Sequence, residues 1–160
     1  MPKSEIPLYQ DKPEYDYWLK LVVAGMLALT FIPGIAAFYW YEELAWTLLG
    51  VTVFDGLLFF AIIPRRFQLF EDRLRIVLGR PFALNVPYEN IREVRPGFPS
   101  EAFIYWGLRF ATSTKNVIEI IREKGLDMVI SPGDKEMFLE QLRQARSTWS
   151  GAEQQPEEQA

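Results

Sequence analysis

The sequence predicts an α+β membrane protein: a two-helix transmembrane hairpin, then a small antiparallel β-barrel or sandwich, then a C-terminal amphipathic helix. Two long segments near the N-terminus are apolar and almost free of charge. Short segments with alternating apolar residues follow, and the last element repeats its apolar residues at helical spacing. We expect a cytoplasmic N-terminal segment (1–16), a transmembrane hairpin (17–64), a cytoplasmic domain (65–146) and a disordered acidic tail (147–160).

Each of the two apolar segments is long enough to cross a membrane. No charged residue lies between Lys20 and Glu42, and Asp55 is the one charged residue of the second segment. A helix needs about 20 apolar residues to span the hydrocarbon layer of a bilayer. We therefore expect helices over about 18–41 and 44–64, and the short connection between them predicts an antiparallel hairpin.

The basic residues that flank the hairpin predict its orientation. Lys12 and Lys20 lie near the start of the first helix, Arg65 and Arg66 follow the second, and the connection carries only acids. Cytoplasmic flanks of membrane helices carry the excess of Lys and Arg. We therefore expect a multi-pass membrane protein with both termini in the cytoplasm.

Asp55 is the polar residue for which the membrane prediction must account. In a hairpin folded about the acidic connection, Asp55 comes level with Thr30. An ionised carboxyl at the bilayer centre costs about 3 kcal/mol on insertion scales. A protonated Asp55 is expected to donate to Thr30 or to the carbonyl of Leu29, which Pro33 leaves without an amide donor. This intramembrane polar pin would act within the hairpin or between protomers; the alternatives are a proton- or ion-handling Asp55 and a different segment boundary.

After Arg66 the apolar residues alternate with a period of two, which is typical of strands. Turn signals such as Gly79-Arg80-Pro81 separate the alternating segments. Short strands at this spacing favour a curled antiparallel sheet over alternating β–α units. Strands are expected within 67–69, 74–78, 91–94, 105–112, 116–123 and 127–131.

The last element is predicted to be an amphipathic helix that covers the open end or seam of this sheet. Either Ser131 or Asp134 is expected to cap its N-terminus, and basic residues lie at its end. The tail that follows has nothing to bury. The apolar stripe of the helix comprises Phe138, Leu142 and Ala145, joined by Met137.

The two apolar segments are followed by "FQLFEDRLRIVLG", "VPYENIREV" and paired strands ending "MVISPGDKEMFLEQLRQA". This order resembles the bacterial membrane-anchored pleckstrin-homology-like (PH-like) proteins, over about Trp18 to Arg146. The resemblance implies a small β-barrel or sandwich closed by a C-terminal helix, in the bacterial cytoplasmic membrane. It also implies a scaffold or interaction role, since the family has no invariant catalytic signature.

Five arginines are candidates for contact with anionic lipid: Arg65, Arg66, Arg73, Arg75 and Arg80. In eukaryotic PH domains, basic residues on the first two strands and their loop hold phosphate groups, so the resemblance implies such a contact here. Arg73 and Arg75 share one sheet face. The adjoining Glu71 and Asp72 would repel phosphate, which favours a solvated face as the alternative. Arg65 and Arg66 are also expected as charges at the membrane surface.

Aromatic residues gather in "RPGFPSEAFIYWG", between two expected strands. Exposed aromatic side chains are frequent anchors for binding partners. The first interpretation is therefore contact with a protein partner or the membrane, and the second is internal packing, with Tyr105 and Trp106 beginning the next strand. The candidate residues are Phe98, Phe103, Tyr105 and Trp106.

The chain has no histidine and no cysteine, which excludes thiol chemistry and the common zinc, copper and haem sites. It also lacks a phosphate-binding glycine loop or a nucleotide fingerprint. We expect no enzymatic activity, no cofactor and no metal, and the sequence identifies no small-molecule substrate. A nucleic-acid partner is not expected, because no strongly basic face is apparent.

The sequence therefore predicts a non-enzymatic, membrane-anchored interaction or scaffold protein. Its partners would be membrane lipids and a protein, either within a membrane complex as an accessory subunit or as a homo-oligomer. The alternative is a small accessory subunit of an ion or solute transport system, with Asp55 as an intramembrane titratable site.

Overall fold

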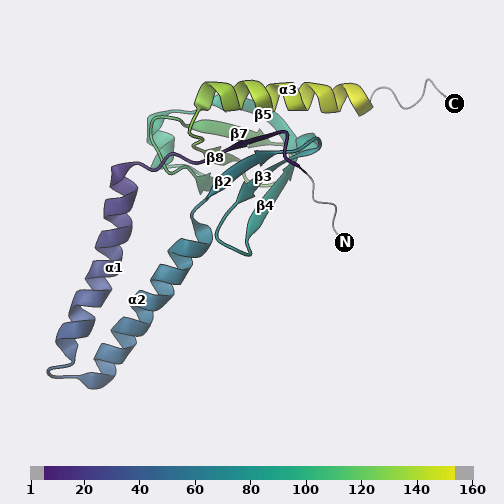
Figure 1. Cartoon of the computed structure of the whole chain (residues 1–160). Helices are drawn as coiled ribbons and strands as arrows, with labels where there is room; N and C mark the ends of the chain where they lie inside the picture. The colour runs from purple at the N-terminus through teal and green to yellow at the C-terminus, as the bar shows by residue number, and fades with distance from the viewer. Residues whose placement is uncertain (1–5, 154–160) are drawn as a thin grey trace.

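The computed structural model describes residues 6–153 (Figure 1). Helices α1 (Tyr17–Ala37) and α2 (Glu42–Ile62) extend from one side of a β domain, and helix α3 (Lys135–Glu153) covers the opposite side. By length and composition, α1 and α2 are apolar enough to cross a membrane. Their bounds lie close to those expected from the two apolar segments.

The strands form two four-stranded sheets that do not close into a barrel. Of the two predicted alternatives, the two-sheet arrangement is the one observed. The first sheet is antiparallel, in the order β1 (Tyr9–Asp11), β2 (Arg66–Leu69), β3 (Arg73–Val77), β4 (Ala83–Pro87). The second has the order β5 (Ile91–Pro96), β7 (Ile118–Arg122), β8 (Met128–Ile130), β6 (Leu108–Phe110). Short 3-10 turns η1 (Tyr88–Asn90) and η2 (Pro99–Ala102) complete the domain.

The second sheet is mixed, which corrects the expectation of a purely antiparallel fold. Strand β6 pairs with β8 in parallel. The reason is the route of the chain, which passes from β6 across β8 to β7 instead of turning back beside β6. Strand β4 was also not among the expected strands, although Leu84 and Val86 alternate with polar residues along it.

One hydrophobic core joins both sheets to α3. Phe138 and Leu142 of α3 are fully buried, and the ring of Phe138 lies 6.0 Å from that of Phe67. Asp134 caps the helix, since its Oδ1 accepts a hydrogen bond of 3.0 Å from the amide of Met137. The side chain of Met137 is 44% exposed and does not join the stripe, because it lies one residue before Phe138 and so points about 100° away.

Helix α3 continues past residue 146, where the sequence analysis ended the domain. Trp149 packs against the core, with its ring 6.5 Å from that of Tyr88. This contact stabilises the helical conformation of residues 147–153, which the sequence analysis placed in a disordered tail. The remaining tail residues, 154–160, lie outside the described residues.

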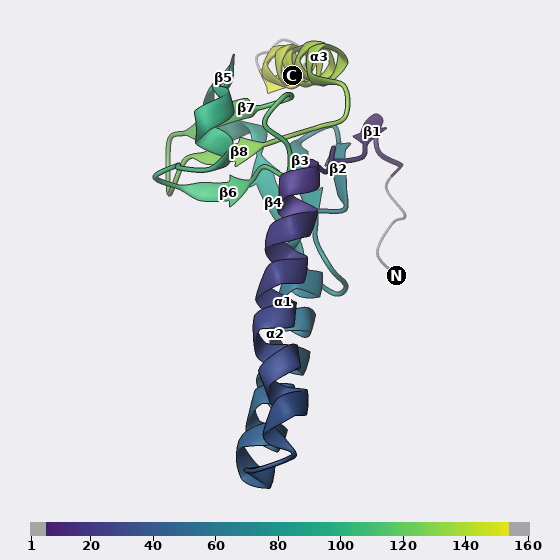
Figure 2. The ribbon, with the colours of Figure 1, turned by 90° about the vertical axis from the view of Figure 1, so that its left-hand side faces the viewer.

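The helical hairpin is inserted between two strands of one sheet. Strand β1 precedes α1 and pairs with β2, which follows α2; Tyr9 lies opposite Leu69 and Asp11 opposite Phe67. Figure 2 shows β1 beside β2, with both long helices running away below them. The N-terminal segment, treated as separate in the sequence analysis, therefore supplies an edge strand of the domain.

Asp16 fastens the start of α1 to the second sheet's loops. Its carboxylate accepts hydrogen bonds from Ser113 Oγ at 2.9 Å, Thr114 N at 2.7 Å and Thr114 Oγ1 at 2.8 Å. Its amide donates to the carbonyl of Thr112 at 3.0 Å. Burial raises the pKa of Asp16, but the hydrogen bonds from Thr114 and Ser113 and the charge of Lys115 outweigh it and lower the pKa below 3.8.

The end of α2 is also held by hydrogen bonds, to the start of the hairpin and to the β3–β4 turn. The hydroxyl of Tyr15 donates to the carbonyl of Pro64, which ties the two ends of the hairpin together. The amide of Gly79, in the β3–β4 turn, donates to the carbonyl of Ala61 at 3.1 Å. A Cβ at Gly79 would lie 1.9 Å from the carbonyl oxygen of Phe60, so only glycine fits this approach.

Small residues let α1 and α2 pack closely near their connection. Gly34, Ala37 and Ala45 are buried, and a Cβ at Gly34 would lie 3.2 Å from Leu49 Cδ2. Close approach through small side chains is the usual basis of helix packing in membranes. Gly50, by contrast, has no atom within 4 Å of such a Cβ.

We expect Gly34→Leu to separate the two helices, because overpacking a close contact costs about 1–3 kcal/mol. The measurement uses Thr30→Cys with Thr52→Cys, whose hydroxyl oxygens lie 2.9 Å apart, as a disulfide reporter in a chain without cysteine. Disulfide yield should fall with Gly34→Leu and stay unchanged with the control Gly50→Leu. Equal yields in both backgrounds would contradict this packing.

We expect Asp16→Ala to lower the melting temperature at neutral pH, because hydrogen bonds to a charged carboxylate contribute about 2 kcal/mol. The pKa of Asp16 is lowered in the folded state, so its contribution is complete above the unfolded value of 3.8 and is lost as the pH falls through the folded value. Thermal melts of both proteins should therefore converge at acidic pH. A constant difference would show that the charge of Asp16 is not involved.

Candidate functional site

The structure does not bring the predicted pair Asp55 and Thr30 together. The hydroxyl of Thr52 donates to that of Thr30 at 2.9 Å, so Thr52 is level with Thr30. The chain turns over residues 38–41, before the acidic residues taken as the fold point, and this shifts the facing register by about one helical turn. Asp55 is half-buried on α2, and its carboxyl group has no hydrogen bond or ion pair within residues 6–153.

Three of the five predicted arginines share the outer face of the first sheet. The β2–β3 register places Arg75 opposite Gln68, and alternation puts Arg66 and Arg73 on the same face. Arg65 lies elsewhere, with its guanidinium 4.1 Å from the centre of the Phe60 ring. Arg80 lies in the β3–β4 turn and is exposed.

This outer sheet face is polar and carries more positive than negative charge. Gln10, Gln68, Arg75 and Asn85 lie side by side across its four strands, and Gln68 donates to Gln10 at 2.8 Å. The Nε of Arg75 is buried and has no hydrogen-bond partner in the described part of the chain. The acid Asp72, expected to repel phosphate, is paired with Arg73 at 2.7 Å. The face is thus suited to an anion near Arg75.

The aromatic segment divides between internal packing and exposure. Tyr105 packs inward, and its hydroxyl donates to Glu119 Oε1 at 2.8 Å. Burial, followed by the hydrogen bond and charge of Glu119, raises the pKa of Tyr105 above its ordinary value. The other three predicted side chains are exposed: Phe98 by 67%, Phe103 by 48% and Trp106 by 97%.

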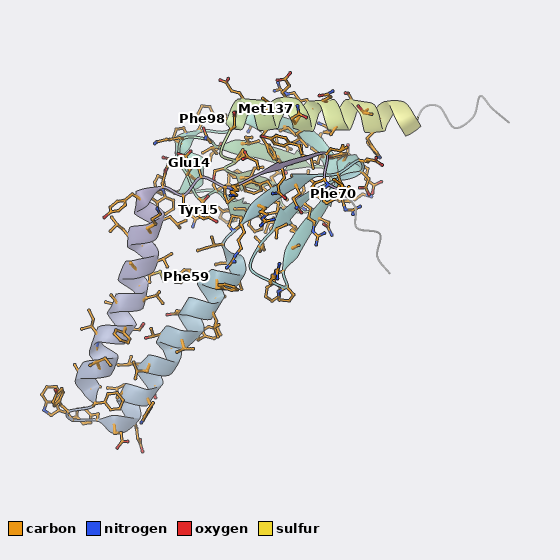
Figure 3. All side chains as sticks on the ribbon, viewed as in Figure 1. Glu14, Tyr15, Phe59, Phe70, Phe98 and Met137 are labelled. Carbon is orange, nitrogen blue, oxygen red and sulfur yellow. The ribbon has the colours of Figure 1, made fainter. Side chains whose placement is uncertain are left out.

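The exposed aromatic residues also lie in different places. The ring of Phe103 lies 4.7 Å from that of Trp18, in the first turn of α1. Figure 3 shows Phe98 above Glu14 and Tyr15, on the side of the domain where α3 and Met137 lie. The segment therefore does not present one aromatic surface.

Glu119 is a site residue that the sequence analysis missed. It is buried in β7, where it accepts hydrogen bonds from Tyr105 and from Nε of Arg95. The available signal was a lone acid within the apolar run "NVIEIIRE". Its two partners come from the segments on either side of η2, so Glu119 holds the shape of the aromatic segment.

A groove between α3 and the β1–β2 edge was also missed. It has a volume of about 650 Å³. Two of its apolar walls, Leu8 and Trp149, come from the N-terminal segment and the predicted tail, which the sequence analysis set outside the domain. The lining residues are Leu8, Tyr9, Leu69, Glu71, Asp72, Gln141, Gln144, Ala145, Thr148 and Trp149.

The bacterial PH domain family has a sequence model that matches residues 65–146, from the end of α2 to the last turns of α3. Searches of curated proteins and of solved structures found no match to this chain. The matched region contains seven of the eight strands and most of α3, which are the elements that the resemblance implied. The chain belongs to the bacterial PH domain family.

Proposed function

We propose that this chain is a non-enzymatic interaction protein of the bacterial cytoplasmic membrane. Helices α1 and α2 cross the bilayer with both termini in the cytoplasm, and the PH domain binds a protein partner through the groove between α3 and β1–β2. The partner is a subunit of a membrane complex or a second copy of the chain. The groove is the observation that supports this proposal best.

The groove combines apolar walls with a polar rim. Leu8 is 59% exposed beside the half-buried rings of Tyr9 and Trp149, so water covers apolar area that a partner side chain would bury. Such burial stabilises a complex by about 25 cal/mol for each Å². The side-chain amides of Gln141 and Gln144 lie on the rim, where they can orient a partner by hydrogen bonding.

The position of the groove fits a partner that approaches from the cytoplasm. Figure 1 shows α3 on the side of the domain opposite the hairpin. Both ends of the hairpin are bonded to the domain, at Asp16 and at Gly79. The anchor therefore holds the groove at a fixed distance from the membrane and in one orientation.

Contact between the outer sheet face and anionic lipid belongs to the same proposal. Arg66, the first residue of β2, lies four residues after the end of α2 and shares that face with Arg75. Neither forms an ion pair with an acid in the part of the chain that the structure describes. A basic face beside a membrane helix attracts anionic headgroups, with about 1 kcal/mol for each arginine near the surface.

We expect Leu8→Asp to weaken capture of the partner, because it places a charge on the apolar wall of the groove. The full-length tagged protein is purified in mild detergent, and the stoichiometric partner or the homo-oligomer is quantified. The matched control is Leu126→Asp, an exposed leucine in the β7–β8 turn outside the groove. A tenfold loss of affinity, about 1.4 kcal/mol, is expected for Leu8→Asp alone. Equal recovery with both variants would exclude the groove as the binding site.

A second candidate function is supported by Asp55. This half-buried carboxyl on an apolar helix forms no side-chain hydrogen bond or ion pair within residues 6–153, and an acid inside a membrane span is a candidate site on an ion or solute pathway. Asp55→Asn should then abolish pH-dependent ion or solute flux in vesicles that contain the purified complex, with unchanged protein yield. If Asp55 is a structural pin instead, the flux persists, because asparagine keeps a hydrogen-bond donor.

A further inference from the structure

Two large apolar side chains stand almost completely exposed between η2 and β6. Ile104 is 85% exposed and Trp106 is 97% exposed. Leaving this much neighbouring apolar area in water is unfavourable, and exposed apolar patches commonly mark contacts with proteins or membranes. The segment therefore needs a partner that covers both side chains.

The exposure does not come from a loose loop. The backbone of the segment is held by Arg109, whose Nη1 donates to the carbonyl of Phe103 at 2.6 Å. Tyr105, between the two exposed residues, points inward and donates to the buried Glu119 at 2.8 Å. The fold thus fixes the segment so that the side chains before and after Tyr105 point outward.

The segment lies beside the start of α1. The ring of Phe103 lies 4.7 Å from the ring of Trp18, the second residue of that helix. Figure 2 shows β6 at the level of the first turn of α1. The first turn of a spanning helix lies among the lipid headgroups, where Trp and Tyr are enriched.

A second exposed group lies in the first sheet, in the turn between β3 and β4, close to the end of α2. The β3–β4 turn is bonded to the last turn of α2 through Gly79 and Ala61. Arg80 and Phe82 of this turn are exposed, Phe82 by 55%. Figure 1 shows the turn extending alongside the end of α2. An arginine beside a phenylalanine suits the interface between headgroups and acyl chains.

We infer that Ile104 and Trp106 insert into the bilayer interface, with Phe82 and Arg80 as a second contact, so that the base of the PH domain rests on the membrane that its helices cross. This inference depends on the proposed membrane anchoring. A lipid surface is the inferred partner because both exposed groups, Ile104 with Trp106 and Arg80 with Phe82, lie beside the ends of α1 and α2 at which these helices join the domain. Phe98 is not part of this contact, since it lies on the side of α3 (Figure 3).

Single labels in full-length protein test the inference, because the chain has no cysteine. Trp106→Cys, Phe98→Cys and Val53→Cys are each labelled with an environment-sensitive fluorophore and reconstituted in phosphatidylcholine–phosphatidylglycerol vesicles. Val53 is 64% exposed on α2 and reports on the anchor. A nitroxide lipid quenches labels in the bilayer, and iodide on both sides of the vesicle quenches labels in water.

The fluorescence emission of the label at position 106 should be blue-shifted relative to that of the label at position 98. The nitroxide lipid should strongly quench the label at position 106, and iodide should quench it several-fold less than it quenches the label at position 98. If the label at 106 behaves like the one at 98 while the label at 53 is quenched by lipid, the anchor stands and the inference is wrong. If the lipid quencher does not reach the label at 53, the proposed membrane anchoring is wrong as well.

Discussion

The pairing of β1 with β2 is the constraint on which the rest of the molecule depends. These strands are consecutive in their sheet, yet the whole helical hairpin separates them in the sequence. Closing a long loop costs conformational entropy. The hairpin reduces this cost because its helices are antiparallel, and the bond from Tyr15 to Pro64 brings its two ends back to one place. The first sheet therefore forms completely only when the helical hairpin is folded.

This arrangement also determines which residues form the groove. Strand β1 supplies Tyr9 to the groove, and the ring of Tyr9 packs 6.1 Å from Phe138 of α3. The groove thus depends on the chain before the helices as well as on the chain after them. A fragment that begins at residue 65 would contain the family's matched region and lack one wall of the groove.

The sequence was sufficient for the elements whose apolar pattern is long or regular. The near absence of charge predicted both long helices, and the spacing of Phe138, Leu142 and Ala145 predicted the buried face of α3. Strand β1 could not be found in this way, because three residues show no clear alternation. The partner of Thr30 was missed because residues 38–41 form the turn, and depth in a hairpin changes with the place of the turn. The groove was missed because its walls are brought together only by tertiary packing.

The interrupted first sheet has a consequence for how the protein is made. Strand β1 leaves the ribosome before α1, and its partner β2 follows only after α2. The sheet therefore remains incomplete until the hairpin has been synthesised and closed. A nascent chain whose helices have not been placed would keep Tyr9–Asp11 as an unpaired edge, open to chaperones and proteases. Completion of the domain therefore depends on closure of the helical hairpin.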